Sequence, residues 1–209
     1  MNVKLAELES ESLRAQMNPH FVFNALNSIQ SFIAVGETMR SEVYLSKFSN
    51  LLRKTLQNSR QKTIPLAQEL ENVEIYLELE KMRFEDKLKY TLEIDPALET
   101  ELIHVPPMLL QPFIENAIVH GLAPKPSGGT ITIKIDTISE ELIRYTIQDD
   151  GVGRKNTSTA EHVSLGTDIV RQRLSLYHEI GKNALIYDDL VDERGEATGT
   201  KVELKVPVS

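Results

Sequence analysis

Residues 16–29 read QMNPHFVFNALNSI, and this stretch places a histidine directly after an Asn-Pro step. Pro19 suits the first turn of a helix, where its missing N–H is not needed, and Asn18 can cap that turn. His20 therefore falls at a predicted helix start or kink, where we interpret it as a reactive side chain. The alternative is a solvated histidine on an ordinary amphipathic helix.

Two stripes run along this predicted helix, which we expect over 19–35. The polar stripe comprises His20, Asn24, Asn27 and Ser31. The apolar stripe comprises Val22, Leu26, Ile29 and Ile33. A second helix is expected over 42–59, after a break near Gly36, and its apolar face is expected at Tyr44, Phe48, Leu52 and Leu56. Two helices alone bury too little surface to be stable, so we expect this hairpin to form a four-helix dimer with a second copy.

The composition sets limits on the class of protein. With 209 residues, 41% hydrophobic and 26% charged, the chain is typical of a globular protein with one large or two small domains. Because it lacks cysteine, disulfides, thiolate zinc sites and cysteine nucleophiles are excluded. The net charge of −8 argues against a broad nucleic-acid surface, so no nucleic-acid partner is expected.

The expected location is cytoplasmic. No stretch approaches the roughly 18 apolar residues of a membrane span, and the polar N-terminus does not resemble a signal peptide.

A domain boundary is predicted near residue 62. Residues 57–63 are polar and end in an Ile-Pro step, and Ile64 is biased away from the helical conformation. Beyond a helix that opens at Pro65, the hydrophobic period changes from helical to alternating. The alternating segments are KYTLEID, TITIKIDTI, LIRYTIQDD, ALIYDDLV and GTKVELKVP. The regions are therefore 1–62, a helical hairpin, and 63–209, an α+β sandwich with a mixed sheet and helices on one face.

Polar residues interrupt the apolar segment VPPMLLQPFIENAIVHGL, which we expect to be a long helix that starts or kinks at Pro112. Glu115, Asn116 and His120 need partners or a ligand in such surroundings. The Asn116 amide oxygen suits Mg²⁺ that also binds phosphate oxygens. The alternative is a helix edge that touches solvent.

A glycine-rich turn follows the strand LIRYTIQDD, giving DDGVG. An acidic residue at a strand end, followed by Gly151 and Gly153, lets the backbone approach a flat ligand closely. Asp149 can accept a hydrogen bond from an exocyclic amine such as that of adenine, although an ordinary turn also explains the motif. A polar segment then leads to Gly166 before a helix, as expected of a phosphate cover. Thr200 opens the final strand, where a hairpin turn is the alternative.

Together and in this order, the motifs resemble the LytS-like subfamily of sensor histidine kinases, over about residues 12–207. QMNPHFVFNALNSI resembles the phosphoacceptor box, IENAIVHGL the asparagine box of the GHKL (Bergerat) ATP-binding fold, and DDGVG its first glycine box. SLGTDIVRQRL resembles its second glycine box and GTKVELKVP its closing strand. The resemblance implies a dimeric helical hairpin followed by a GHKL catalytic domain.

The resemblance also implies roles for individual residues. His20 is the residue phosphorylated by ATP, and Asn24 orients its imidazole. The implied nucleotide residues are Asn116 for Mg²⁺, Asp149 for the adenine amino group, Gly151 and Gly153 for the purine edge, Gly166 for the phosphates, Thr200 for the adenine side, and Glu115 and His120 as supporting groups. The implied partners are the receiver domain of a response regulator and a second copy of the chain. Because sensor kinases carry an input module before these helices and only residues 1–11 precede them here, the resemblance also implies the cytoplasmic part of a larger membrane protein.

The sequence departs from the family pattern at two places. Many other histidine kinases carry an acidic residue directly after the phosphoacceptor, but here Phe21 follows, so the general base is not identified. Ser164 stands where the second glycine box usually has glycine, and Ile169 where asparagine is frequent. Two alternatives remain: a nucleotide-binding dimeric scaffold without kinase activity, and a GHKL ATPase in which Glu115 activates water.

Overall fold

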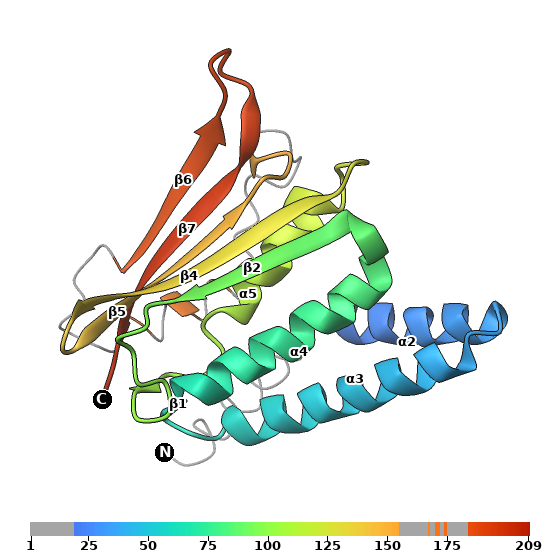
Figure 1. The fold of residues 1–209 in the computed structure, drawn as a ribbon, viewed down its shortest axis with the longest axis horizontal. Coiled ribbons are helices and arrows are strands. Elements are labelled where there is room, and N and C mark those ends of the chain that lie inside the picture. Colours follow the sequence, from blue (N-terminus) through green and yellow to red (C-terminus); the bar gives the residue numbers. More distant parts are fainter. Residues whose placement is uncertain (1–18, 155–166, 168–169, 172–173, 175–183) are drawn as a thin grey trace, which may run out of the picture.

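The computed structural model describes residues 19–154, 167, 170, 171, 174 and 184–209, with side chains from residue 21 onwards. A five-stranded mixed sheet carries helices on one face, and a helical hairpin lies beyond one of these helices (Figure 1). This is the α+β class that the sequence predicted. In the described part of the chain, no helix has both the length and the apolar character that crossing a membrane requires.

The hairpin consists of α2 (Pro19–Ala34) and α3 (Thr38–Asn58). The break predicted near Gly36 is confirmed, because this glycine adopts a φ of 83° that side chains disfavour. Helix α3 begins earlier than the predicted residue 42. The Glu37 carbonyl already accepts a hydrogen bond from the Ser41 N–H at 3.0 Å, which completes the first helical turn.

The predicted apolar stripes of the hairpin were partly wrong. Leu26 and Ile33 are 47% and 59% exposed. The buried residues of α2 are Phe21, Ala25, Ser28 and Phe32, and those of α3 are Ser41, Tyr44, Phe48, Leu51, Thr55 and Asn58. The error on α3 has a geometric cause: a repeated spacing of four residues rotates about 40° per step around a 3.6-residue helix, so the series leaves the buried face at Leu52 and Leu56.

Helix α4 (Leu66–Phe84) packs against α3 and against the sheet, and it provides the third helix of the bundle (Figure 1). It follows β1 (Ile64–Pro65), which pairs with β3 (His104–Val105), so the predicted non-helical Ile64 is confirmed. The two-helix hairpin is therefore covered within one chain. Dimerisation and the boundary at residue 62 stay predictions.

All five predicted strands are present in one sheet, in the order β2-β4-β5-β7-β6. The strands are β2 (Leu88–Ile94), β4 (Gly129–Ser139), β5 (Leu142–Asp149), β6 (Leu185–Val191) and β7 (Ala197–Pro207). Strand β2, which a 3₁₀ turn η1 (Glu85–Lys87) joins to α4, is parallel to β4, and the other neighbours are antiparallel.

Alternation along the central strands explains the single covered face. On β4, Ile131, Ile133 and Ile135 are fully buried, while Thr132 and Lys134 on the other face are not. Because strand side chains alternate between faces, this pattern buries one side of the sheet against the helices.

The segment predicted as one long helix is shorter and has two parts. Helix α5 (Gln111–Asn116) continues as a π-helical turn, η2 (Ala117–Leu122). The predicted start near Pro112 is confirmed, since this proline lies in the first turn. A helix over the preceding residues was wrong, because Pro106 and Pro107 disfavour it and Met108 has a φ of 61°.

Candidate functional site

Asp149 is a buried carboxyl group at the end of β5. Its side chain is 5% exposed, and Oδ1 accepts a hydrogen bond from the Gly151 N–H at 2.9 Å. Across the ladder it pairs with Thr200 of β7, which is 9% exposed. Burial raises the pKa of Asp149 to about 6, against the hydrogen bonds from Gly151 and Thr200 that lower it. The strand end thus holds a carboxyl group that is readily protonated just below neutral pH.

Backbone of η2 and backbone of the Asp-Gly turn are in direct contact around this carboxyl group. A Cβ atom on Gly151 would lie 2.4 Å from the Gly121 carbonyl, and one on Gly121 would lie 2.7 Å from Asp149 Oδ1. The Val152 N–H also donates to the Gly121 oxygen at 3.0 Å. Gly199, with a φ of 148°, would place a Cβ 2.0 Å from the backbone carbonyl oxygen of Asp149. We call Gly121, Gly151, Gly199 and Asp149 the glycine cradle. None of its three glycine positions has room for a side chain in this arrangement.

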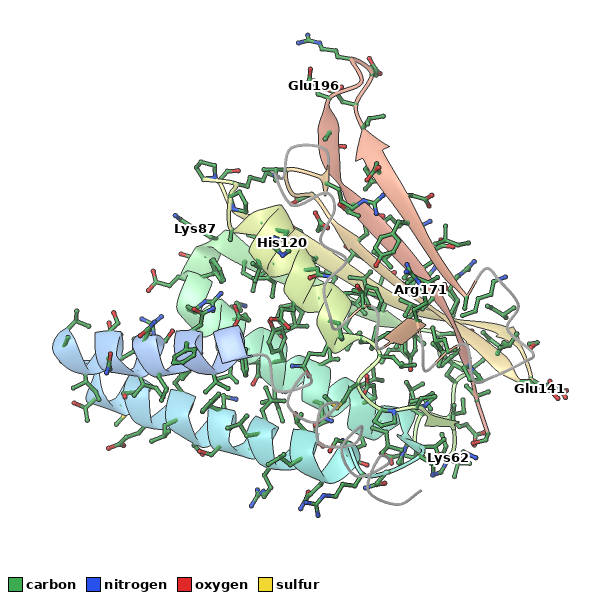
Figure 2. All side chains as sticks on the ribbon, turned by 180° about the vertical axis from the view of Figure 1, so that it is seen from behind. Lys62, Lys87, His120, Glu141, Arg171 and Glu196 are labelled. Carbon is green, nitrogen blue, oxygen red and sulfur yellow. The ribbon has the colours of Figure 1, made fainter. Side chains whose placement is uncertain are left out.

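The predicted residues of the asparagine box lie beside this cradle. Glu115 and Asn116 end α5 and are half-buried, and η2 then leads directly to Gly121. His120 is exposed on η2 (Figure 2) and is not enclosed with them. Gly166 lies outside the described residues. Over the described part of the chain, no three His, Asp or Glu side chains form a group suited to a metal ion.

Gly153 lies at the other side of the turn and adopts a φ of 70°. A Cβ atom there would come within 2.8 Å of the Ala197 Cβ on β7. The chain therefore leaves the sheet through a conformation that glycine adopts most easily. This agrees with the sequence argument that a glycine is needed at that position.

Arg154 was not anticipated from the sequence. Its guanidinium binds Asp189 of β6 through two hydrogen bonds of 2.7 and 3.2 Å, and it lies 4.7 Å from the centre of the Tyr187 ring. A bidentate arginine–carboxylate pair of this kind fixes the orientation of the two side chains as well as their distance. It ties the residue that follows Gly153 to the β6–β7 hairpin. No sequence motif links Arg154 to an aspartate so far along the chain.

Glu69 of α4 was also missed. This carboxylate is 2% exposed and accepts hydrogen bonds from the N–H groups of Met108, Leu109 and Leu110 at 2.8, 2.9 and 3.3 Å. These three residues directly precede Gln111, the first residue of α5, so Glu69 holds the segment that leads into the helix from a neighbouring element. It therefore fixes the helix that carries Glu115 and Asn116.

The polar stripe of α2 faces η2 across a cavity of about 460 Å³. The residues that line it are Asn24, Asn27, Ser28, Ser31, Arg83, Val119 and Ala123. This confirms that Asn24, Asn27 and Ser31 share one face. His20 lies on the same helix, one turn before Asn24, and its side chain is outside the described residues. The predicted phosphoacceptor stripe thus runs beside the turn whose Gly121 contacts Asp149.

Residues 8–88 match the histidine kinase family. The sensor protein LytS of Enterococcus faecalis is 31% identical over 98% of this chain, which spans 35% of that protein. The sensor histidine kinase/phosphatase LytS of Staphylococcus aureus is 30% identical over 87% of this chain and 32% of its own length. The chain therefore spans about a third of the length of these relatives.

A solved structure shares the fold. The histidine kinase domain of the blue-light activated histidine kinase EL346 from Erythrobacter litoralis superposes with a TM-score of 0.53 at 17% identity, covering 88% of this chain and 93% of that domain. At this identity the likeness concerns the fold. The sequence similarity along nearly the whole chain shows that the protein belongs to the family of LytS-like sensor histidine kinases.

Proposed function

We propose that this chain is the kinase core of a two-component sensor, which transfers the γ-phosphoryl group of ATP to His20 and then to an aspartate of a response regulator. The observation that carries the proposal is the glycine cradle. A buried carboxyl group with backbone closely packed around it offers a hydrogen-bond acceptor to a flat, amine-bearing base. The polar stripe of α2 lies on the other side of η2.

The donor set fits a nucleotide with Mg²⁺. In this proposal Asp149 is the acceptor for the adenine amino group, and the backbone at Gly151 and Gly153 contacts the purine edge. Asn116 supplies an amide oxygen, the type of hard ligand that Mg²⁺ takes together with phosphate oxygens and water. When bound, Mg²⁺ neutralises phosphate charge. Glu115 and His120 are supporting groups near the phosphates, Thr200 lies on the adenine side, and Gly166 contributes its backbone.

Histidine suits the acceptor role. A neutral imidazole is nucleophilic near pH 7, and its phosphoryl adduct is a good donor to an aspartate. Phosphoryl transfer depends mainly on positioning and charge neutralisation. We propose that Asn24 orients the imidazole, and that residues 57–63 allow the catalytic region 63–209 to move relative to the hairpin.

The proposed partners follow from the same role. A receiver domain takes the phosphoryl group, and a second copy of the chain binds through α2 and α3. We place the chain on the cytoplasmic side of a membrane, as the inner part of a longer sensor. No nucleic-acid partner is proposed.

The test is phosphorylation of the purified chain with γ-labelled ATP and Mg²⁺. We expect acid-labile label in the wild type and none in His20→Gln. Label that persists in this variant would overturn the assignment of His20. Mg²⁺-dependent nucleotide binding without phosphohistidine under any activating condition would favour the dimeric scaffold instead. Steady ATP hydrolysis that survives the loss of His20 would favour an ATPase.

A further inference from the structure

Helix α4 carries a buried ion pair that the sequence motifs do not explain. Glu80 is 1% exposed, and its Oε2 lies 2.8 Å from the Arg83 Nη2. The two groups are close enough for an ion pair, but their geometry does not form a hydrogen bond, and Oε2 has no hydrogen-bond partner among the described residues. Burying such a pair costs more than it returns unless geometry is ideal, so its presence calls for a role beyond stability.

The pair lies between the two predicted reaction partners. Arg83 lines the same cavity as Asn24 and Asn27 of the phosphoacceptor helix. On the other side, Glu80 is close enough to Glu115, beside the proposed Mg²⁺ ligand, for the charge of Glu115 to raise the pKa of Glu80. An arginine at this position faces both the polar stripe of α2 and the helix of the asparagine box.

One turn of η2 separates the cavity from the glycine cradle, the proposed adenine site. Val119 and Ala123 line the cavity, whereas Gly121 between them contacts Asp149 and Gly151. The distance a phosphoryl group would travel is thus about the width of a helix, of order 10 Å.

The Arg83 guanidinium has capacity for a second anion. It carries five N–H donors, and over the described residues Glu80 is its one ion-pair partner. Its position is fixed on another side by the Phe84 ring, 4.5 Å away. The side chain keeps 19% exposure, so a group that enters the cavity can reach it.

We propose that Arg83 contacts the phosphoryl group as it passes to His20, and that Glu80 positions Arg83 for this contact. The inference rests on the phosphotransfer function proposed above. In that step a ring nitrogen of His20 bonds to the γ-phosphorus of ATP, and the bond from this phosphorus to the bridging oxygen breaks. ADP leaves with that electron pair, and the other ring nitrogen releases its proton to water.

Arginine suits this step because charge spreads over three phosphoryl oxygens in the transition state, and a forked guanidinium binds two of them at once. During transfer, the negatively charged phosphoryl group replaces Glu80 as the main partner of Arg83. Glu80 touches neither ATP nor His20 in this proposal, so it is a positioning residue.

The test compares Arg83→Gln with the wild type by single-turnover phosphorylation and by equilibrium dialysis of ATP. We expect the transfer rate to fall about 100-fold while the Kd for ATP changes less than about twofold. Arg83→Lys keeps the charge but loses the fork, and a loss of about tenfold is expected. Glu80→Gln should slow transfer by about tenfold without changing the Kd for ATP.

Two further samples separate catalysis from folding. Arg53 is exposed on α3 and donates to Asn50 within its own turn at 3.1 Å, so Arg53→Gln is the matched control and should transfer at the wild-type rate. Because Arg83→Gln leaves a buried carboxylate without its cation, the double variant Glu80→Gln/Arg83→Gln removes both charges. It should fold and bind ATP but transfer as slowly as Arg83→Gln.

Chemical rescue of an Arg83 variant distinguishes direct contact with the phosphoryl group from a purely structural role. Added guanidinium should restore part of the rate in Arg83→Ala, which a purely structural role would not produce. The role of Arg83 would be overturned, and the proposed function would stand, if Arg83→Gln or the double variant folds, binds ATP and transfers within about threefold of the wild-type rate. A wild-type chain that forms no phosphohistidine would overturn the proposed function as well.

Discussion

At the scale of single residues, Asp149 determines which base the site accepts. A carboxylate accepts a hydrogen bond from the amino group of adenine but meets an oxygen acceptor in guanine. We expect ATP to bind at least tenfold more tightly than GTP, and Asp149→Asn to weaken ATP binding by about 1.5–3 kcal/mol, the range for hydrogen bonds to charged groups. Equal Kd values for ATP and GTP by equilibrium dialysis would contradict this role.

The raised pKa of Asp149 makes this binding depend on pH. The acceptor is the ionised form, which predominates above a pKa of about 6. ATP affinity should therefore fall as the pH drops through about 6, by up to tenfold per further unit. The Asp149→Asn variant should lack this component, and dialysis at matched ionic strength on both sides of the pKa tests the difference.

The raised pKa of Glu80 makes the free energy of unfolding depend on pH. Burial raises its pKa from 4.5 to about 7, so its contribution to stability is complete below about 4.5 and is lost as the pH rises through about 7. Between these limits the wild type should lose roughly 3 kcal/mol of unfolding free energy relative to Glu80→Gln. Urea unfolding of both chains at about pH 4.5 and about pH 8 measures this; parallel pH profiles would contradict it.

At the scale of elements, the contact of η2 with the Asp-Gly turn depends on glycine. In Gly151→Ala the new Cβ meets the Gly121 backbone at 2.4 Å, so one of the two segments must move. We expect a loss of about 1–3 kcal/mol in stability, typical of overpacking, and at least tenfold weaker ATP binding.

The matched control is Gly195→Ala. This glycine, in the β6–β7 turn, also has a positive φ of 79°, but a Cβ atom there meets nothing within 4 Å. It should lose about 1 kcal/mol from backbone strain and keep its ATP affinity. Denaturant titration and dialysis compare the two variants, and equal ATP affinities would contradict the steric argument.

Removal of the Glu69 carboxylate should loosen the segment that leads into α5. Glu69→Ala leaves three N–H groups without their acceptor, at an expected cost of about 2–4 kcal/mol. Hydrogen exchange should be faster at Met108, Leu109 and Leu110 than in the wild type, with β4 protected as before. Unchanged exchange at these amides would contradict this role of Glu69.

The elements differ in how far the sequence predicted them. Alternation located every strand of the sheet because its period of two is distinct even over seven residues. Helix faces were harder: Leu26 and Leu56 fit an apolar stripe but are exposed, since several apolar stripes compete on each helix. The π-helical turn that contains Gly121 was not predicted, and its contacts with Asp149 and Gly151 join segments that are far apart in the sequence.

At the scale of the whole molecule, the sequence located the parts of the site that are local in the chain. Asp149, Gly151 and Asn116 belong to short motifs whose spacing carries the signal. Glu69 escaped notice because the N–H groups that it binds come from another segment, and Arg83 because the residues that line the cavity with it do. From the sequence, helix α4 is an ordinary amphipathic helix. In the fold it packs against α3 and the sheet, and its Arg83 lines the cavity.

The exposed side of α2 predicts the state of assembly. Phe23, Leu26 and Ile33 recur at helical spacing and are 65%, 47% and 59% exposed, an apolar stripe that a second copy would cover. Leu26→Glu/Ile33→Glu should convert a dimer to a folded monomer, whereas Leu102→Glu, at a 68% exposed loop position, should leave the dimer intact. Multi-angle light scattering measures the masses. A monomeric wild type at micromolar concentration, or a double variant that stays dimeric, would exclude this face as the interface.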